Sequence, residues 1–581
     1  MKVFNEMRKS KYYIPALSIL IAAACCIFFY KHFPIFYDIN DDTTMRNIAS
    51  GAYTGEPDGH VVFIKYALGC VISGLYGLIS SIDWYGTVLF SLHFICLMFV
   101  ICRVMKALRE KSKLLLCLSG VIIFIMIDIS NIVSNFQFTT TAAVCGATAL
   151  FLFISMPKGQ QSKDFVLSCL PIGFLVTVSF CIRDKVLLMM VPAAIVVWIY
   201  RMIEEKDTKG AVRRYIVFCF SVMAALLAVV LVERAAYSSE EWKDYRKFNS
   251  ARSEILDYYG YPDYETHQEA YDKIGISKEE YDLLINNTLN FSSELTMQKY
   301  IELADYSKAV YEKANPITER LGESVKNTIY YTMNIMASGK TSIVLIIYFF
   351  LLLFGLIHKR YKMVLSLIII FVCREAVYLY PIMLNRFLPR IYDSLLLCDY
   401  AVAAGYLLHS GVLHKLALPK NKISSMTVAV ILGMIGVSTY LSYYDYRNAG
   451  GEDVDGIVNE YCTKNKLNGR YLLDSSGFTV GRDNFVFRSE SPYINYLTMY
   501  GWSCNSELYL EKAEKMNMKE RDSALLDEDV FLIATSVPNE SGLVNAIINY
   551  YDSIGVSVDY EVVDTIPLSE TEYSVLKFYS K

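Results

Sequence analysis

Long apolar stretches recur along most of this chain, and short polar segments that carry most of the charge separate them. Each stretch is close to the roughly 20 residues that a helix needs to cross the hydrocarbon core of a bilayer. The pattern predicts about eleven spanning helices, at residues 12–30, 84–102, 114–130, 138–155, 164–182, 186–200, 215–232, 339–357, 363–380, 392–409 and 424–442. We therefore expect an α-helical polytopic membrane protein.

Basic residues set the expected orientation of these helices. Several precede the first stretch, at positions 2–11, so the positive-inside rule keeps the N-terminus in the cytoplasm. A further apolar stretch at 61–81 contains Lys65 and several glycines. If it crossed the membrane, the basic segment 103–113 would lie outside, so we expect 61–81 to lie at the outer interface without crossing. The C-terminal region is then extracytoplasmic.

The polar segments divide the chain into four regions. An N-terminal membrane region with an acidic outer loop is followed by a hydrophilic outer loop region, a second membrane region and a C-terminal outer domain. The expected bounds are 1–232 (with the outer loop at 31–60 and the interfacial helix at 61–81), 233–338, 339–442 and 443–581.

The two outer regions differ in their patterns. Residues 233–338 are polar and rich in tyrosine, and Ser277-Lys278-Glu279-Glu280 is a capping box that opens a short helix. The tyrosines could stack on sugar faces, or they could pack and anchor at lipid head groups.

The C-terminal region mixes short β-rich runs with helical stretches, which predicts a small α/β domain. The runs lie at 470–473, 530–534 and 573–578, and a helical stretch lies at 506–517. Because the region has no nucleotide-binding glycine loop and no nucleophile elbow, we expect a substrate-binding or packing module there rather than the catalytic site.

Composition narrows the class of function. Apolar residues make up 54% of the 581 residues and the net charge is only −4, which favours a cell-membrane protein and gives no support to nucleic-acid binding. Most of the 14 cysteines lie in apolar stretches, where they are typical small hydrophobic residues. Cys462 and Cys504 lie outside these stretches and could pair or remain free thiols. The sequence has no metal-ligand spacing.

An acidic cluster follows the first spanning helix. Asp38, Asp41 and Asp42 lie within five residues, at the expected outer surface of the membrane. Carboxylates this close raise the proton affinity of one member, and a charged one can take a proton from an attacking hydroxyl, so the cluster suits a general base. It could instead hold a divalent cation through oxygen ligands. The third interpretation is that Asp41 or Asp42 caps a helix that begins near Thr43.

Cationic side chains near the outer surface are candidates for binding a phosphate, because guanidinium groups match phosphate oxygens. Arg374 lies inside an expected span. A charged side chain is costly to insert into the bilayer, so we expect Arg374 to have a partner or a function there. The other candidates, in two outer turns, are Arg386, Arg390, Arg183 and Lys185. The alternatives are an internal ion pair for Arg374 and lipid head-group contacts for the others. His60, in the first outer loop, is a further candidate for substrate binding.

The first hundred residues resemble the GT-C glycosyltransferases, a group that includes the protein O-mannosyltransferases and the bacterial lipid A aminoarabinose transferase. The resemblance covers residues 12–105 and runs from Asp41-Asp42 through Ile48-Ala-Ser-Gly51 and Gly59-His60-Val61 to Trp84-Tyr85. It implies a lipid-linked sugar donor and an acidic catalytic base, for which Asp41 and Asp42 are the matching positions. The chain departs from the group in having Val61-Val-Phe63 where Pro-Pro-Leu usually follows the histidine. It also lacks the Trp-Trp-Asp motif, which disfavours peptide N-glycosylation.

These observations predict a membrane glycosyltransferase that transfers a sugar from a polyprenyl-phosphate donor to an extracytoplasmic glycan, lipid or protein, in the biosynthesis of a cell-envelope polysaccharide or similar product. We expect membrane lipid as a partner, no nucleic acid and no required cofactor, with a divalent cation left open. One alternative is a lipid or polysaccharide flippase or transporter, which predicts inverted repeats that the sequence does not clearly show. The other is a non-catalytic scaffold that binds a surface polymer.

Overall fold

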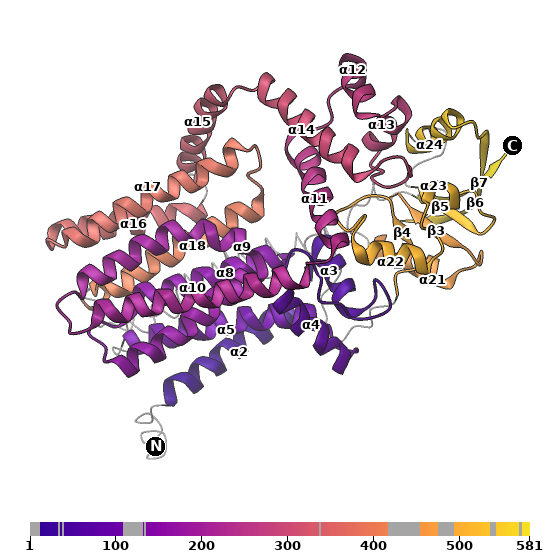
Figure 1. Ribbon diagram of the computed structural model, residues 1–581. Coiled ribbons are helices and arrows are strands. Elements are labelled where there is room, and N and C mark those ends of the chain that lie inside the picture. The colour runs from indigo at the N-terminus through magenta and orange to yellow at the C-terminus, as the bar shows by residue number, and fades with distance from the viewer. Residues whose placement is uncertain are drawn as a thin grey trace.

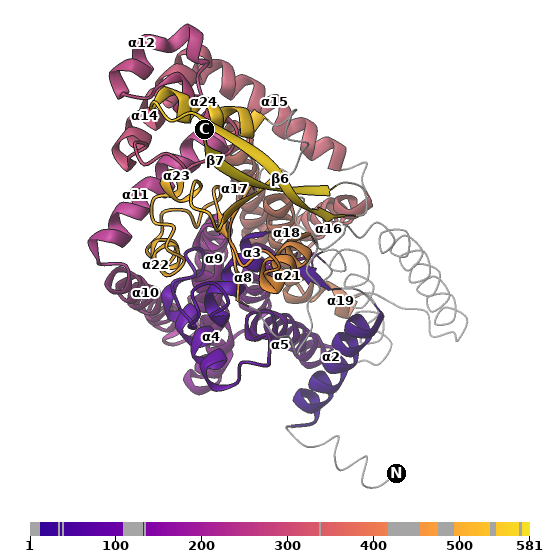
Figure 2. The same cartoon turned by 90° about the vertical axis from the view of Figure 1, so that its right-hand side faces the viewer.

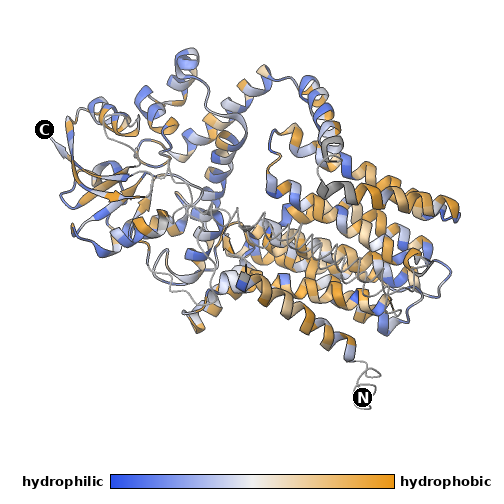
Figure 3. Ribbon diagram, turned by 180° about the vertical axis from the view of Figure 1, so that it is seen from behind, coloured by the Kyte–Doolittle hydropathy of each residue, from blue (hydrophilic) through white to orange (hydrophobic). Residues whose placement is uncertain are grey.

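Helices formed by the apolar stretches lie side by side in a bundle at one end of the molecule, and the sheet of the C-terminal region lies at the other end (Figure 1). The computed structural model describes residues 12–32, 35–37, 40–108, 132, 135–335, 339–415, 454–474, 493–534, 542–568 and 572–581. The bundle is the more apolar part in Figure 3, as expected of helices that face lipid. We call the end that bears the sheet the outer end, after the orientation that the sequence predicts.

Seven helices of the described residues are long and apolar enough to cross a membrane, so the chain is a multi-pass membrane protein. They are α2 (Tyr13–His32), α5 (Trp84–Ala107), α8 (Phe138–Ser155), α9 (Ser162–Glu204), α10 (Ala211–Ala236), α17 (Tyr361–Met383) and α18 (Pro389–His409). Helix α16 (Gly339–Ile357) packs on α17 and α18, and its described apolar part, Val344–Ile357, is shorter than these seven helices. Helix α19 (Val412–Lys415) follows α18. Helix α8 lies at the centre, because almost all its residues are buried.

Helix α9 is two antiparallel arms joined at Arg183, whose backbone leaves the helical region (φ −155°, ψ 96°). A Cβ on Gly146 of α8 would lie 2.9 Å from Sδ of Met190 and 3.1 Å from Oγ of Ser179. Eleven residues of one straight helix would separate those two side chains by about 16 Å, so the arms fold back on each other. With both arms and α16 counted, nine of the eleven expected spans are confirmed, and those expected at 114–130 and 424–442 lie outside the described residues.

The stretch expected at the interface contains α4 (Tyr66–Leu78), which has 13 residues. At 1.5 Å per residue it is about 20 Å long, too short for a hydrocarbon core of about 30 Å. Gly69 of α4 lies against the preceding turn, since a Cβ there would be 2.1 Å from the carbonyl oxygen of Gly59. Only glycine allows this approach, which fixes the segment before α4 against the helix.

Short helices form the outer loops. The first loop folds as α3 (Asn40–Ser50), next to a two-stranded parallel pairing of β1 (Phe36–Tyr37) with β2 (Asn135–Phe136). The second outer region contains α11 (Glu240–Glu254), the π-helix η2 (Ile255–Tyr259), α12 (Tyr264–Ile274), α13 (Lys278–Ile285), α14 (Met297–Ala314) and α15 (Ile317–Ile335). The predicted capping box is confirmed: the Ser277 hydroxyl accepts from the Glu280 N–H at 3.1 Å, and the Glu280 carboxylate accepts from the Ser277 N–H at 2.9 Å.

The C-terminal region is the predicted small α/β domain. Its five-stranded sheet has the order β4-β3-β5-β7-β6, with β3 parallel to β4 and β5, and β7 antiparallel to β5 and β6. The strands are β3 (Arg470–Leu473), β4 (Leu497–Thr498), β5 (Val530–Ala534), β6 (Val558–Pro567) and β7 (Glu572–Ser580). The helices are α21 (Val454–Lys464), α22 (Glu507–Lys515), α23 (Arg521–Ala524) and α24 (Gly542–Ser553). Cys462 and Cys504 are both free thiols.

Alternation along the strands gives the sheet two apolar faces. Tyr471 and Ile533 pack with α21 in a core of their own, whereas Leu472 and Leu532 belong to the large core that continues into the outer loops and the bundle. Seen from the outer end, the sheet and α21 lie in front of α3, α8 and α9 (Figure 2). The domain is therefore packed against the outer end of the bundle.

Candidate functional site

Helix α3 places the acidic pair of the first outer loop at the outer end of the bundle. It begins at Asn40, so Asp41 and Asp42 lie in its first turn, and the expectation of a helix that begins near Thr43 was wrong by three residues. Negative side chains are favourable in the first turn of a helix. Met45 and Ala49, three and seven residues after Asp42, are fully buried on the same helix face as Asp42, which fixes that face of α3 in the core. Asp38 lies outside the described residues.

Asp42 has a structural position. Its side chain is fully buried, and Oδ1 accepts hydrogen bonds from the Tyr85 hydroxyl at 2.7 Å and from the Phe138 N–H at 2.9 Å. Tyr85 is on α5, and Phe138 is the first residue of α8, where the N–H has no partner within its own helix. Asp42 therefore joins α3 to two helices of the bundle.

Asp41 is the member of the pair that faces the other charges. It is half-buried, and the cations that act on it are Arg390, Arg183 and Arg252, while the Trp502 indole donates a hydrogen bond to it. Burial raises the pKa of Asp41, although the three guanidinium groups and the Trp502 hydrogen bond each lower it. The two carboxylates that the sequence presents as a pair thus have different environments.

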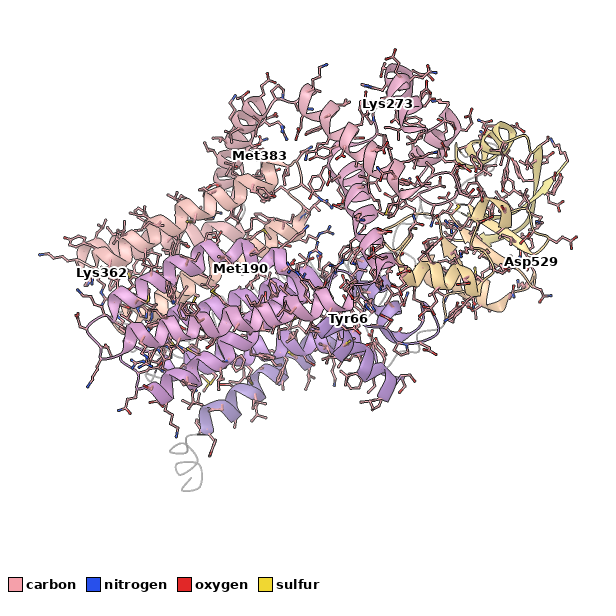
Figure 4. The ribbon with its side chains drawn as sticks, in the orientation of Figure 1. Tyr66, Met190, Lys273, Lys362, Met383 and Asp529 are labelled. Carbon is pink, nitrogen blue, oxygen red and sulfur yellow. The ribbon has the colours of Figure 1, made fainter. Side chains whose placement is uncertain are left out.

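Four separate parts of the chain contribute to the surroundings of Asp41. Arg183 forms the turn of α9, Arg390 lies in the first turn of α18, and Arg252 lies in the last turn of α11. Trp502 comes from the segment between β4 and α22 of the C-terminal domain. The cluster therefore involves the bundle, the outer loop region and the sheet domain. In Figure 4 the labelled Tyr66, at the start of α4, lies where the bundle meets the sheet domain that carries the labelled Asp529.

Sequence reasoning named Arg183 and Arg390 but missed Arg252 and Trp502. Arg252 is one of many charged residues in a polar region, and no local pattern sets it apart. Trp502 had one usable signal, because it is one of only four tryptophans and lies in a short apolar segment of an otherwise polar domain.

The Arg183 side chain is held by aromatic rings. Its guanidinium carbon lies 5.1 Å from the ring centroid of Phe63 and 5.2 Å from that of Phe138. Its neighbour Asp184 forms an ion pair with Lys65 at 2.8 Å, which ties the turn of α9 to the segment before α4. Cation–π contacts of this kind hold a guanidinium in place while leaving its N–H groups available to oxygen ligands.

Arg386 lies close to this cluster but has a partner of its own. It forms an ion pair with Asp257 at 2.8 Å and stacks over Tyr258 at 5.0 Å. Both partners belong to η2, and π-helical turns often occur at functional sites. The charge of Arg386 also acts on Arg183, so it adds to the positive potential of the cluster.

The structure places Arg374 in the internal ion pair that was the alternative to phosphate binding. Its Nε donates to Asp399 of α18 at 2.8 Å, and its guanidinium stacks over Tyr378 at 4.1 Å. Glu375 and Thr332 contact it from the other side. Only 7% of Arg374 is exposed, and these contacts lie among α15, α17 and α18 rather than around Asp41.

His60 also has its own partners. Its Nδ1 is 2.7 Å from the Asp58 carboxylate, its Nε2 is 3.3 Å from the carbonyl oxygen of Ala236, and its ring stacks on Trp242. Burial lowers the pKa of His60, but the hydrogen bond and charge of Asp58 outweigh it and leave that pKa raised. Both ring nitrogens face acceptors, which suits a doubly protonated ring. His60 thus joins the first outer loop to the end of α10.

The chemistry of the cluster favours an anionic ligand. The charges of three guanidinium groups act on the carboxylate of Asp41, so cations outnumber it even when it is ionised. Guanidinium groups bind phosphate through paired N–H donors, whereas a divalent cation needs several oxygen ligands. Within the described ranges, no group of three His, Cys, Asp or Glu side chains could hold a metal ion.

Comparisons with known proteins give little. No family model matches the chain, and no curated protein matches it. A solved structure titled "Crystal Structure of ArnT from Cupriavidus metallidurans bound to Undecaprenyl phosphate" covers 98% of this chain and 98% of its own, with 9% identity and a TM-score of 0.38. ArnT is a lipid A aminoarabinose transferase, one of the group that residues 12–105 resemble. A likeness at this TM-score supports no conclusion about this chain.

Proposed function

We propose that this chain is a membrane glycosyltransferase that transfers a sugar from a polyprenyl-phosphate donor to an acceptor hydroxyl on the outer side of the membrane. One observation carries the proposal: the half-buried carboxylate of Asp41 lies in the first turn of α3, at the outer end of the bundle, where the charges of Arg183, Arg252 and Arg390 act on it. A base beside a phosphate-binding cluster is what transfer from a lipid phosphate requires.

The position of the arginines suits a lipid-linked phosphate. Arg390 is the second residue of α18 and Arg183 ends the first arm of α9, so both lie at the ends of helices whose apolar bodies continue into the bundle. A lipid whose tail lies along those helices would present its phosphate at this level. Arg252 reaches the same place from the outer loop, so the phosphate would be held from the membrane side and from the outer side.

In the proposed reaction, the acceptor oxygen forms a bond to the anomeric carbon of the sugar as the bond from that carbon to the phosphate oxygen breaks. Asp41 takes the proton of the acceptor hydroxyl, and polyprenyl phosphate leaves. The arginines stabilise the negative charge that develops on the phosphate, and they act strongly because the site is partly shielded from water. The raised pKa of Asp41 makes its carboxylate a better proton acceptor near neutral pH.

Release of polyprenyl phosphate tests the proposal. The purified full chain, in lipid nanodiscs, is incubated with a panel of polyprenyl-phosphate sugars and envelope acceptor fractions, and free polyprenyl phosphate is measured by mass spectrometry. We expect one donor to be consumed by the wild type and not by a double Arg183→Gln, Arg390→Gln variant. Arg213→Gln, an exposed arginine of α10, is the matched control and should retain activity. No consumption across the panel, with unchanged surface glycan in a host lacking the chain, would contradict the proposal.

A further inference from the structure

Phe63 lies where three parts of the site meet. Its ring centroid is 4.8 Å from that of Trp502 in the C-terminal domain, and it stacks nearly parallel to Phe138 at the start of α8, with centroids 6.0 Å apart. The Arg183 guanidinium at the turn of α9 lies against the same ring. Trp502 and Arg183 are two of the groups that act on Asp41, and Phe138 is held by Asp42.

An unusual turn directs Phe63 to this place. The Phe63 N–H donates to the carbonyl oxygen of Val61 at 2.7 Å, which closes a three-residue γ-turn around Val62. Val62 has a φ of +62°. Positive φ is a true outlier for a β-branched residue, and γ-turns with positive φ at the central residue are rare and strained.

Contacts from neighbouring helices hold this turn. The Val62 N–H donates to the Tyr237 hydroxyl at 3.1 Å, just after α10. The Lys65 N–H donates to the carbonyl oxygen of Cys181 at 2.7 Å, and the Tyr66 N–H donates to Glu233 at 2.7 Å. Strained backbone persists where the surroundings determine it from several sides, and it gathers at functional sites.

We propose that Phe63 is a positioning residue that links the C-terminal domain to Asp41, by holding the Trp502 indole and the Arg183 guanidinium beside the carboxylate. The inference rests on the proposed role of Asp41 as the base. Phe63 makes no contact with the reacting atoms in this account. It acts indirectly: by holding Trp502 and Arg183 in place, it sets the charge state and geometry of the Asp41 carboxylate.

The sign of the effect follows from the groups around Asp41. Arg183 of α9, Arg390 of α18, Arg252 of α11 and the Trp502 indole all favour the charged carboxylate, and Tyr85 of α5 lies close by. If Phe63 no longer holds Trp502 and Arg183, two of these groups act less on Asp41. Its pKa then rises further, and the acidic limb of the pH–rate profile moves to higher pH.

The transfer assay gives the first test. Phe63→Leu keeps most of the apolar volume and loses the aromatic face, while Phe63→Tyr keeps the face and serves as the conservative control. We expect Phe63→Leu to lower kcat/KM by about ten- to a hundredfold, as small misplacements of catalytic groups do, with Phe63→Tyr near the wild type. Because Phe63 acts through Trp502, the double Phe63→Leu, Trp502→Phe variant should lose little more than the worse single variant. Additive losses with an unmoved pH profile would overturn the inference.

A second test does not need transfer. Trp502 emission, taken as the difference between each protein and its Trp502→Phe counterpart, is followed across pH in nanodiscs, and Asp41→Asn identifies the transition due to Asp41. We expect the midpoint of that transition to lie at higher pH in Phe63→Leu than in the wild type and in Phe63→Tyr. An identical midpoint in a folded Phe63→Leu protein would overturn the inference. Absence of transfer by the wild type would instead overturn only the proposed function.

Discussion

Replacing Asp41 and Asp42 one at a time by asparagine separates the chemical role proposed for the first from the structural position of the second. Asp41→Asn keeps the size of the side chain and removes its ability to take a proton. A general base contributes about 10²- to 10⁴-fold to a rate, so transfer should fall by that factor. Because burial raises the pKa of Asp41, its charge is disfavoured by folding, and the melting temperature should stay the same or rise.

Asp42→Asn should do the reverse. The amide keeps an oxygen that can accept from both Tyr85 and Phe138 but loses the charge that strengthens both bonds. Bonds to charged groups contribute about 1.5–3 kcal/mol and neutral ones about 0.5–1.5 kcal/mol, so the change should cost about 1–3 kcal/mol of stability. Turnover per folded molecule should remain within severalfold of the wild type.

The assay measures polyprenyl phosphate release per folded molecule, with the folded fraction taken from a thermal melt of each variant in the same nanodiscs. Full activity in Asp41→Asn would refute the assignment of the base. Equal losses of turnover in both variants, with unchanged melting temperatures, would refute the division of roles between the two carboxylates.

The remaining predictions concern pairs outside the Asp41 cluster. His60 has a raised pKa, so its stabilising contribution is complete below about pH 6.5 and is lost as the pH rises through its folded pKa. The melting temperature of the wild type should therefore fall as the pH rises from about 6.5 through that folded pKa. An Asp58→Asn variant should show a flatter dependence of melting temperature on pH. Arg374→Leu alone leaves Asp399 buried without its partner and should cost about 3–5 kcal/mol, whereas a double Arg374→Leu, Asp399→Leu variant should melt closer to the wild type. A double variant no more stable than the single one would contradict the pairing.

Local patterns predicted most of the fold. The β-rich runs at 470–473 and 530–534 have the bounds that β3 and β5 show, because a strand buried on both faces of a sheet is visible in the sequence as a short, nearly continuous apolar run. The spans followed from apolar length alone. The start of α3 was misplaced, since the signal for a helix cap at Asp41 or Asp42 could not be told from acidic residues inside the first turn.

The candidate site was predictable only in part. Asp41, Arg183 and Arg390 could be named because charges beside membrane spans are conspicuous in an apolar sequence. Their meeting with Arg252 and Trp502 depends on contacts between segments up to several hundred residues apart, which no local pattern carries. Arg374 shows the same limit, because its position predicts that it has a partner or a task but does not say that Asp399 is that partner.

Binding of polyprenyl phosphate to the purified chain tests the central claim most directly. Native mass spectrometry or a fluorescent lipid titration in nanodiscs gives the dissociation constant for the wild type, for Arg183→Gln and for Arg390→Gln. Each arginine contributes charge-assisted hydrogen bonds of about 1.5–3 kcal/mol, so each variant should bind about 10- to 100-fold more weakly, while Arg213→Gln should bind as the wild type does. Equal affinity in all four proteins would contradict a phosphate site beside Asp41.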